Sequence, residues 1–260
     1  MGKGNDFVYG LRQLRPSGED DAALAATSHA GTTVFGPRLS PMKLRAMATA
    51  VLMLCAVATA PVATAATAAL KCSPATAKPH AAPVFKQPRK MLKAKTYIFT
   101  FKTNCGTIKV AADARHAPIT VRNLAFLAGK KYFNNTLCHR LTTAGIYILQ
   151  CGDPTTTGYG SPGFQYADEN LPTKMAKKRY PAGTVAMANG GPGTNGSQFF
   201  LVYKDANPDL PASYTIWGHI TAGLDILKAI AAKGTRTGST DGPPAQALSV
   251  ISVTVSEGTP

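Results

Sequence analysis

The feature that most constrains the fold lies in the last three fifths of the chain. There, short runs of β-type residues are separated by glycine- and proline-rich stretches. In the first run the aromatic residues Tyr97, Phe99 and Phe101 alternate, which is the period of a half-buried strand. A turn at 104–106 and a second apolar run at 107–110 follow. Two alternating runs around an Asn/Gly turn predict a β-hairpin, so the domain is expected to be mainly β.

Two segments of this domain have helical spacing of their apolar residues. The first follows Ala117, with Thr120 as the expected N-cap and Gly129 as the expected residue after the helix. The second runs over 223–233 and is expected to end before Gly234. About 160 residues of many short strands with two helices fit one closed antiparallel barrel.

The N-terminal part of the chain differs in composition from this domain. Residues 1–41 are polar, glycine-rich and aperiodic, so we expect them to be disordered or, if translation starts at Met42, absent. Residues 42–70 begin with a short basic stretch, continue without a charge and end in Ala/Thr repeats, which is typical of a secretory signal peptide. The uncharged run is also long enough to cross a bilayer, so a retained membrane anchor and a plain Ala-rich segment are the alternatives. The weak hydrophobicity of its second half favours cleavage and an exported protein, extracellular or at the outer face of the cytoplasmic membrane.

The chain is strongly basic, with 28 Lys and Arg residues against 13 Asp and Glu residues and a net charge of +15. Residues 71–95 hold a dense share of this charge together with several prolines and no acid. This composition predicts a linker before a domain at 96–258. The linker is either a solvated spacer or a contact site for an anionic membrane or cell-wall polymer. Basic residues are spread thinly over the domain, so no nucleic-acid partner is expected.

Several short motifs are misleading. The segments 158–163 and 191–196 match G-x-G-x-x-G, but neither is followed by a helical pattern, which a dinucleotide site requires. Neighbouring residues on a strand point to opposite faces, so Cys138 and His139 are not expected to form a nucleophile and base pair. The His and Cys residues show no metal-ligand spacing. We therefore expect neither a metal nor another cofactor.

Two longer blocks carry the functional signal. The first reads Cys-His-Arg-Leu at 138–141 and Tyr-Ile-Leu-Gln-Cys-Gly-Asp-Pro at 147–154; the second is V-A-M-A-N-G-G-P-G-T-N-G-S-Q-F-F at 185–200. Over about residues 96–256 the chain resembles the cyclophilin family of peptidyl-prolyl cis-trans isomerases, and its variant motifs look most like the exported or membrane-associated bacterial branch. The resemblance implies a closed eight-stranded antiparallel β-barrel capped by two α-helices. It also implies a monomer with a proline-binding groove on the outer surface, acting on proline-containing polypeptides.

The resemblance also assigns roles to residues. Rotation about an X-Pro bond crosses a barrier of roughly 20 kcal/mol because amide resonance is lost, and no covalent step is needed. A fixed guanidinium can donate to the prolyl nitrogen as it gains a lone pair, or hold the adjacent carbonyl. Arg140 matches the catalytic arginine of the family, and Gln150 and Phe200 complete the expected catalytic set. The expected substrate-binding residues are His139, Tyr147, Ile148, Ala188, Asn189, Gln198, Leu210 and Tyr214.

Each assignment has a plainer alternative. Arg140 could be a surface ion-pair partner, and Phe200 could belong only to the core. The side chains of Asn189 and Gln198 could merely satisfy loop backbone groups. His139 could be structural or lie at the edge of the groove. The leading functional hypothesis is a peptidyl-prolyl isomerase that assists the folding of exported proteins; the alternative is a catalytically weak scaffold of the cell envelope that binds proline-containing peptides.

The cysteines support an exported domain. If the signal peptide is cleaved, Cys72, Cys105, Cys138 and Cys151 remain, and an even number in an exported chain suggests disulfides. Cys138 and Cys151 flank a loop between two predicted antiparallel strands, so we expect them to lie opposite each other and form one bridge. The pair 72–105 would then tie the linker to the first hairpin turn. Two reduced, buried thiols at 138 and 151 are the alternative.

Overall fold

The computed structural model describes residues 70–174, 179–205 and 210–258. The expected leader, and all of the expected signal peptide or anchor except Leu70, lie outside the described residues. Among the helices in the described ranges, none is both long and apolar enough to span a bilayer.

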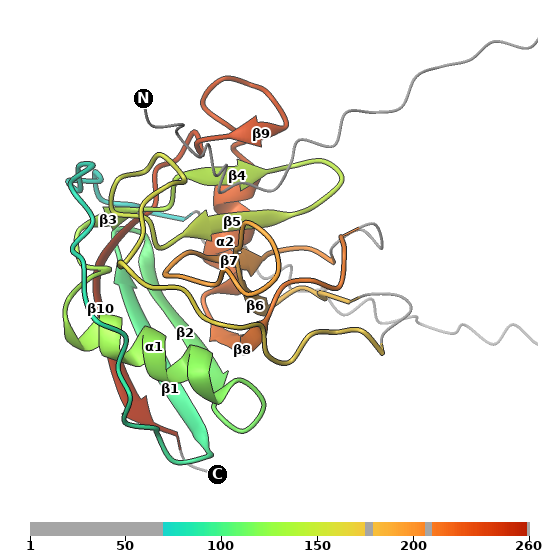
Figure 1. Cartoon of the computed structure of the whole chain (residues 1–260). Helices are drawn as coiled ribbons and strands as arrows, with labels where there is room; N and C mark the ends of the chain where they lie inside the picture. Colours follow the sequence, from blue (N-terminus) through green and yellow to red (C-terminus); the bar gives the residue numbers. More distant parts are fainter. Residues whose placement is uncertain (1–69, 175–178, 206–209, 259–260) are drawn as a thin grey trace, which may run out of the picture. The chain divides into compact units, whose positions relative to one another are not determined.

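The described domain is built on one antiparallel sheet with the order β3-β10-β1-β2-β8-β6-β7-β5-β4-β9 (Figure 1). The strands in these residues are β1 Thr96–Thr103, β2 Gly106–Asp113, β3 Thr136–Leu137, β4 Arg140–Thr142, β5 Ile148–Cys151, β6 Thr184–Met187, β7 Phe199–Val202, β8 Ile216–Ala222, β9 Asp241–Gly242 and β10 Ser249–Glu257. The mainly β prediction is confirmed, but the closed eight-stranded barrel is wrong: the sheet has ten strands, and its order runs open from β3 to β9. Only two residues separate β3 from β4 in the chain although they lie far apart in this order, so the sheet is strongly curled.

The alternation read from the sequence sorts side chains onto two faces of the sheet. The β1–β2 hairpin is confirmed, with Thr103 opposite Gly106 across the turn. On β7, Phe199 and Leu201 join the main core, while Phe200 and Val202 belong to a separate apolar cluster on the opposite face. Because side chains alternate along a strand, one short run serves both the core and the outer face.

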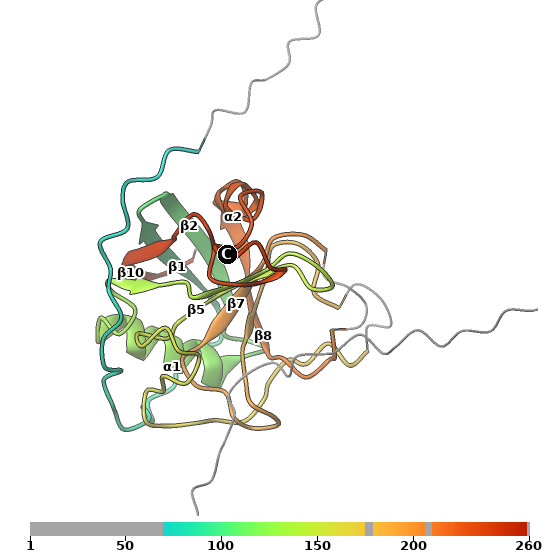
Figure 2. The same cartoon turned by 90° about the horizontal axis from the view of Figure 1, so that it is seen from above.

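Two helices accompany the sheet, α1 Pro118–Gly129 and α2 Leu224–Ala231. Figure 2 shows them on opposite sides of the domain with the strands between them. Gly129 is the last helical residue rather than the first one beyond the helix, and α2 ends at Ala231, short of the predicted 223–233.

Thr120 is not the N-cap of α1, because the helix begins two residues earlier, after Ala117. The N-terminal N–H groups of α1 are satisfied instead by Glu169, whose carboxylate accepts from the backbone of Ile119 at 2.9 Å and Thr120 at 2.8 Å. A carboxylate there also complements the positive end of the helix dipole. The prediction failed because the capping group comes from a distant segment.

The basic segment 70–93 contains no helix or strand, yet it packs against the domain. In Figure 1 it runs past α1, where the ring of Phe85 lies 5.7 Å from Phe126, centre to centre. Its backbone also bonds to domain loops, from Phe85 to Pro162 at 2.8 Å and from His80 to Pro154 at 3.0 Å. The segment is therefore more than a spacer, since its apolar side chains contribute to the core.

Two disulfides join the pairs favoured by the sequence, Cys72–Cys105 and Cys138–Cys151. The first ties the basic segment to the β1–β2 turn. The second does not join directly opposed residues as expected. The pairing of β4 with β5 sets Arg140 opposite Gln150, so Cys138 lies beyond the end of this pairing, in the link between β3 and β4.

Candidate functional site

A row of residues crosses four neighbouring strands on the face opposite the main core. Arg140 on β4 lies opposite Gln150 on β5, which in turn lies opposite Phe200 on β7. Phe200 lies opposite Ala186 on β6. Residues directly opposed in an antiparallel ladder place their side chains on the same face, so the register alone brings the three expected catalytic residues together.

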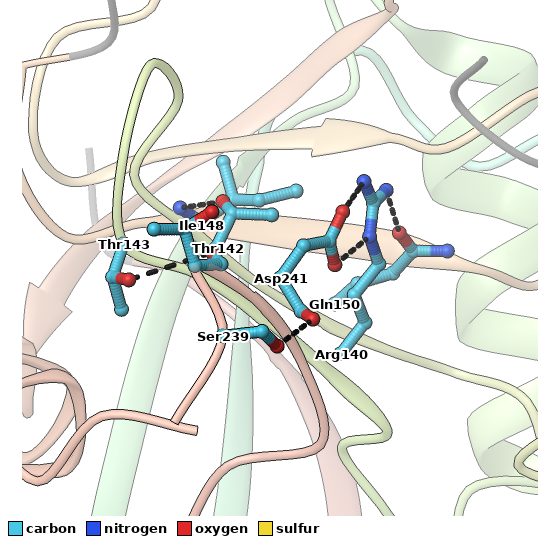
Figure 3. A network of polar contacts seen from close by, with 8 residues as sticks. Arg140, Thr142, Thr143, Ile148, Gln150, Ser239 and Asp241 are labelled. Atoms are coloured by element: carbon cyan, nitrogen blue, oxygen red, sulfur yellow. Dashed lines mark hydrogen bonds and ion pairs between the residues drawn. The ribbon is translucent and has the colours of Figure 1, made fainter. Parts of the chain in front are cut away.

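Arg140 forms the polar end of this row. Its Nε donates to Oδ1 of Asp241 at 2.8 Å, and its Nη2 donates to Oδ2 of the same carboxylate at 2.6 Å. On its other side, Nη1 donates to Oε1 of Gln150 at 3.5 Å. Figure 3 shows the guanidinium between these two partners. The ion pair foreseen as the plainer alternative for Arg140 therefore exists, and it exists within the predicted site.

The polar contacts continue from Gln150 to a neighbouring loop. The amide Nε2 of Gln150 donates to Oε1 of Gln198 at 2.9 Å. Gln198 then donates to the carbonyls of Gly158 at 2.8 Å and Gly160 at 3.2 Å. Gln198 thus does satisfy loop backbone groups, as its alternative reading held, and the same bonds fix Gln150 beside Arg140.

An apolar cluster occupies the centre of the row and the strands beside it. Its buried members are Ile148, Tyr180, Ala186, Phe200, Val202, Leu210 and Tyr214. The rings of Tyr180 and Tyr214 pack edge-on against Phe200 at 6.1 and 5.5 Å. Phe200 and Ile148 are fully buried, so they form the floor of the cluster rather than an open surface.

Tyr214 links the apolar cluster to the arginine electrostatically. Burial raises the pKa of its phenol, while the positive charge of Arg140 and a hydrogen bond from Ser213 act in the opposite direction. The phenol is therefore neutral near neutral pH and remains available as a hydrogen-bond donor or acceptor.

A pocket opens beside the two glutamines. It is an open depression whose space, including the solvent at its mouth, is about 430 Å³. Its lining includes Gln150, Ala188, Asn189, Gln198, Tyr159 and Thr194. Asn189 is fixed by a bond from its Nδ2 to the Ser213 carbonyl at 2.9 Å, and its Oδ1 accepts from the Gly191 backbone at 3.3 Å. The structure thus brings Ala188 and Asn189 to the same pocket wall as Gln150.

Two of the predicted substrate-binding residues lie elsewhere. Tyr147 does not join Phe200; it packs against the main core, with its ring 6.0 Å from Tyr203 and the Lys204 ammonium 4.4 Å from its centre. The family resemblance assigned Tyr147 to the proline pocket, but side-chain alternation puts residue 147 on the other face from Ile148.

The second of these residues is His139, which is half-buried and has no contact among the described residues that would give it a part in the site. Neither ring nitrogen has a hydrogen-bond partner within the described ranges. Burial lowers its pKa, with the Arg140 charge acting in the same direction and Asp153 opposing it. The ring is therefore neutral at neutral pH, in line with a structural position next to the arginine.

Two residues beside the row, Asp241 and Tyr180, were not predicted from the sequence. Tyr180 donates from its hydroxyl to the Pro211 carbonyl at 3.0 Å and the Tyr214 carbonyl at 3.3 Å, which holds the segment that carries Tyr214. Neither residue belongs to a motif block, so only the fold reveals them.

Comparison with known proteins points to the same family as the motif blocks. The family model described as "Cyclophilin type peptidyl-prolyl cis-trans isomerase/CLD" matches residues 98–255. The chain belongs to this family. The match covers more than half of the chain and includes every residue of the row.

Similar curated proteins come from mycobacteria. "Probable peptidyl-prolyl cis-trans isomerase B" of Mycobacterium leprae is 47% identical over 161 residues, covering 58% of this chain and 54% of that protein. Its Mycobacterium tuberculosis counterpart is 44% identical over 161 residues, covering 58% and 52%. The chain thus spans about half the length of these curated relatives.

Solved structures of the family include a cyclophilin type peptidyl-prolyl cis-trans isomerase from Cryptosporidium parvum. It superposes with a TM-score of 0.54 at 27% identity, covering 63% of this chain and 99% of that one. A second structure of that protein was obtained in the presence of the dipeptide Ala-Pro.

Proposed function

We propose that this protein accelerates cis-trans rotation of X-Pro bonds in polypeptides. The observation that carries the proposal is the row across the sheet, in which a fixed guanidinium and a fixed amide stand beside a buried apolar cluster. A proline ring is apolar while the amide on its nitrogen side is polar, so such a boundary fits the two parts of an X-Pro unit. That a related protein was studied with Ala-Pro supports the same substrate class.

The chemistry follows from the donors that Arg140 retains. A guanidinium has five N–H groups, of which the contacts with Asp241 and Gln150 use three. One hydrogen on each terminal nitrogen is left to donate to the prolyl nitrogen or the adjacent carbonyl. Such a donation is stronger in the twisted state, where the nitrogen has regained its lone pair, so it lowers the barrier without covalent chemistry.

The clients are proposed to be exported proteins. Two disulfides within the described domain fit an oxidising compartment. The signal-like composition of 42–70 supports the same setting. N-terminal sequencing of the protein recovered outside the cytoplasm tests this proposal, because a mature N-terminus near residue 70 is expected and an intact Met1 would contradict cleavage.

The basic segment is proposed to contact anionic membrane or cell-wall polymers. Its lysines at 71, 78, 86 and 90 are exposed even though the segment packs on the domain. Binding to anionic vesicles that weakens steeply with salt is the expected behaviour.

A binding scaffold without useful turnover is the second candidate. One observation favours it, since Phe200 and Ile148 expose almost no surface in this structure. A proline would therefore contact the cluster through its edge unless side chains rearrange. The scaffold binds proline peptides without accelerating their isomerisation, and a rate assay distinguishes the two functions.

The test is the isomerisation rate of an X-Pro tetrapeptide with the full oxidised chain. We expect acceleration by the wild type and a fall in kcat/KM of about 100-fold or more in Arg140→Ala, as for loss of a key transition-state donor. Arg115→Ala removes the same charge from an exposed position outside the row and is the matched control. A folded Arg140→Ala protein with wild-type turnover would refute the mechanism, and an inactive wild type that still binds the peptide would establish the scaffold.

A further inference from the structure

The loop that follows α2 returns to the sheet and brings an acidic residue to the edge of the site. Its short strand β9 pairs with β4, with Asp241 opposite Thr142. Because residues two apart on a strand share a face, Arg140 and Thr142 lie on the same side, and Asp241 is the diagonal neighbour of Arg140. Diagonal neighbours are about 7–8 Å apart between backbones, a span that a long arginine side chain bridges.

The contact fixes the plane of the guanidinium rather than only its charge. Both carboxylate oxygens of Asp241 accept, one from Nε and one from Nη2, at 2.8 and 2.6 Å. A two-point contact of this kind allows one orientation of a planar group, whereas a single bond would leave it free to rotate. The edge formed by Nη1 faces Gln150, as Figure 3 shows.

The backbone that carries Asp241 is itself held by its loop. Thr143 donates its backbone N–H to the Thr240 carbonyl at 2.8 Å, which continues the β4–β9 pairing. The Ser239 hydroxyl donates to the Asp241 carbonyl at 2.7 Å. Asp241 is therefore placed before any substrate arrives, and the guanidinium that it binds is preorganised in turn.

From this geometry we propose that Asp241 is the positioning residue of the isomerase site, which holds Arg140 in its productive orientation without touching the substrate. The inference rests on the proposed function. It gives a part in the reaction to the loop 234–245, which lies outside both motif blocks.

The carboxylate of Asp241 has two opposite effects on Arg140. It orients the guanidinium, and it also neutralises part of the positive charge that would stabilise the transition state. The side chains of Arg140 and Asp241 are 20% and 38% exposed, so water screens the charge effect. Orientation is a geometric constraint that water does not screen. Removing the carboxylate is therefore expected to lower the rate.

The stability of the fold gains little from this pair. Partly exposed ion pairs contribute little to stability because solvent screening and side-chain ordering offset the attraction. A substitution at residue 241 should therefore leave thermal unfolding nearly unchanged, so activity and stability can be separated.

The experiment measures kcat and KM for an X-Pro tetrapeptide with the full oxidised chain and its Asp241→Asn, Asp241→Glu and Asp225→Asn variants. Asp241→Asn is expected to lower kcat/KM by about tenfold, mostly in kcat, since misplacement of a catalytic group by about 1 Å can cost a hundredfold. Asp241→Glu keeps the carboxylate and is expected to recover most of the rate. Asp225→Asn makes the same charge change on the exposed side of α2 and is expected to have no effect.

A double-mutant cycle separates positioning from a merely structural role. In an Arg140→Lys background there is no planar group to orient, so Asp241→Asn should lower kcat/KM by less than about twofold further. An equal fall in both backgrounds would overturn the proposal, as would an unchanged or increased rate in Asp241→Asn alone.

A second readout does not depend on activity. The Nε–H resonance of Arg140 in nitrogen-15 NMR should be sharp and slow to exchange in the wild type, and broadened or lost in Asp241→Asn. An inactive wild type would remove the proposed function, and this resonance would still decide whether Asp241 orders the guanidinium. A resonance that is insensitive to Asp241→Asn would overturn the inference by itself.

Discussion

Removal of the Cys138–Cys151 bridge tests how the site region is stabilised. The perturbation is the double variant Cys138→Ala/Cys151→Ala in the full chain. The two cysteines are 13 residues apart in sequence, and the loop-closure relation for such a loop gives a loss of about 3 kcal/mol in the free energy of unfolding. Both sulfurs are buried, so lost packing adds to this figure rather than offsetting it.

The assay is urea unfolding followed by tryptophan fluorescence. The chain has one tryptophan, and Trp217 is fully buried between Phe99 and Phe199, so its emission reports unfolding of the main core. The urea dependence should steepen slightly, because the unfolded chain without the bridge is more expanded. Isomerase activity per folded molecule should be largely retained, since β4 is also paired with β9 and β5 with β7.

The matched control is Cys72→Ala/Cys105→Ala. These cysteines are 33 residues apart, so the same relation gives a loss of about 4 kcal/mol. A loss under about 1 kcal/mol for the 138–151 variant would refute the loop-closure reasoning. A loss under about 1 kcal/mol for the 72–105 variant would contradict the dependence on loop length.

Two further predictions concern single residues beside the site. Burial lowers the pKa of His139 below its usual value of 6.5, so as the pH falls the unfolded chain takes up a proton before the folded chain does, and stability is lost. His139→Gln should flatten the decline of the unfolding free energy between about pH 7.5 and 5.5, and identical slopes would disprove this cause. Gly152 has φ 91°, and a Cβ there would lie 2.4 Å from the Ser197 carbonyl oxygen, so Gly152→Ala should destabilise by about 3 kcal/mol or more in the same urea assay. Gly193 has φ 73° with open space around it, so Gly193→Ala should cost only about 1 kcal/mol, and equal losses would exclude the clash.

The pattern of residues along the chain predicted those parts of the structure that depend on residues close together in the sequence. The alternation of Tyr97, Phe99 and Phe101 predicted a half-buried strand, and the structure places Phe99 in the core. The family resemblance assigned Arg140, Gln150 and Phe200 to one site, and the structure places them on adjacent strands. The cysteine pairing was also predicted, although its register was not. The strand follows from periodicity, which can be read within a few residues, whereas the site residues followed from the family resemblance carried by the two motif blocks.

The features that the sequence could not supply depend on contacts between distant segments. Asp241 meets Arg140 across 101 residues, and the register that makes them diagonal neighbours is set only when β9 pairs with β4. Glu169 caps α1 across about 50 residues in the same way. The basic composition of 70–93 concealed Phe85, a single aromatic residue whose packing turns a linker into part of the domain.

The position of a residue in the row also determines whether its substitution can change activity without changing stability. In the apolar centre of the row Phe200 has no exposed surface, so a large-to-small substitution there would cost about 3–5 kcal/mol and would change stability and substrate contact together. At its polar end Arg140 and Asp241 are partly exposed and contribute little to the core, so their substitution changes the orientation and charge of the donor while the fold persists. A loss of isomerisation in the polar variants therefore assigns the chemistry, whereas a loss in the apolar variants does not.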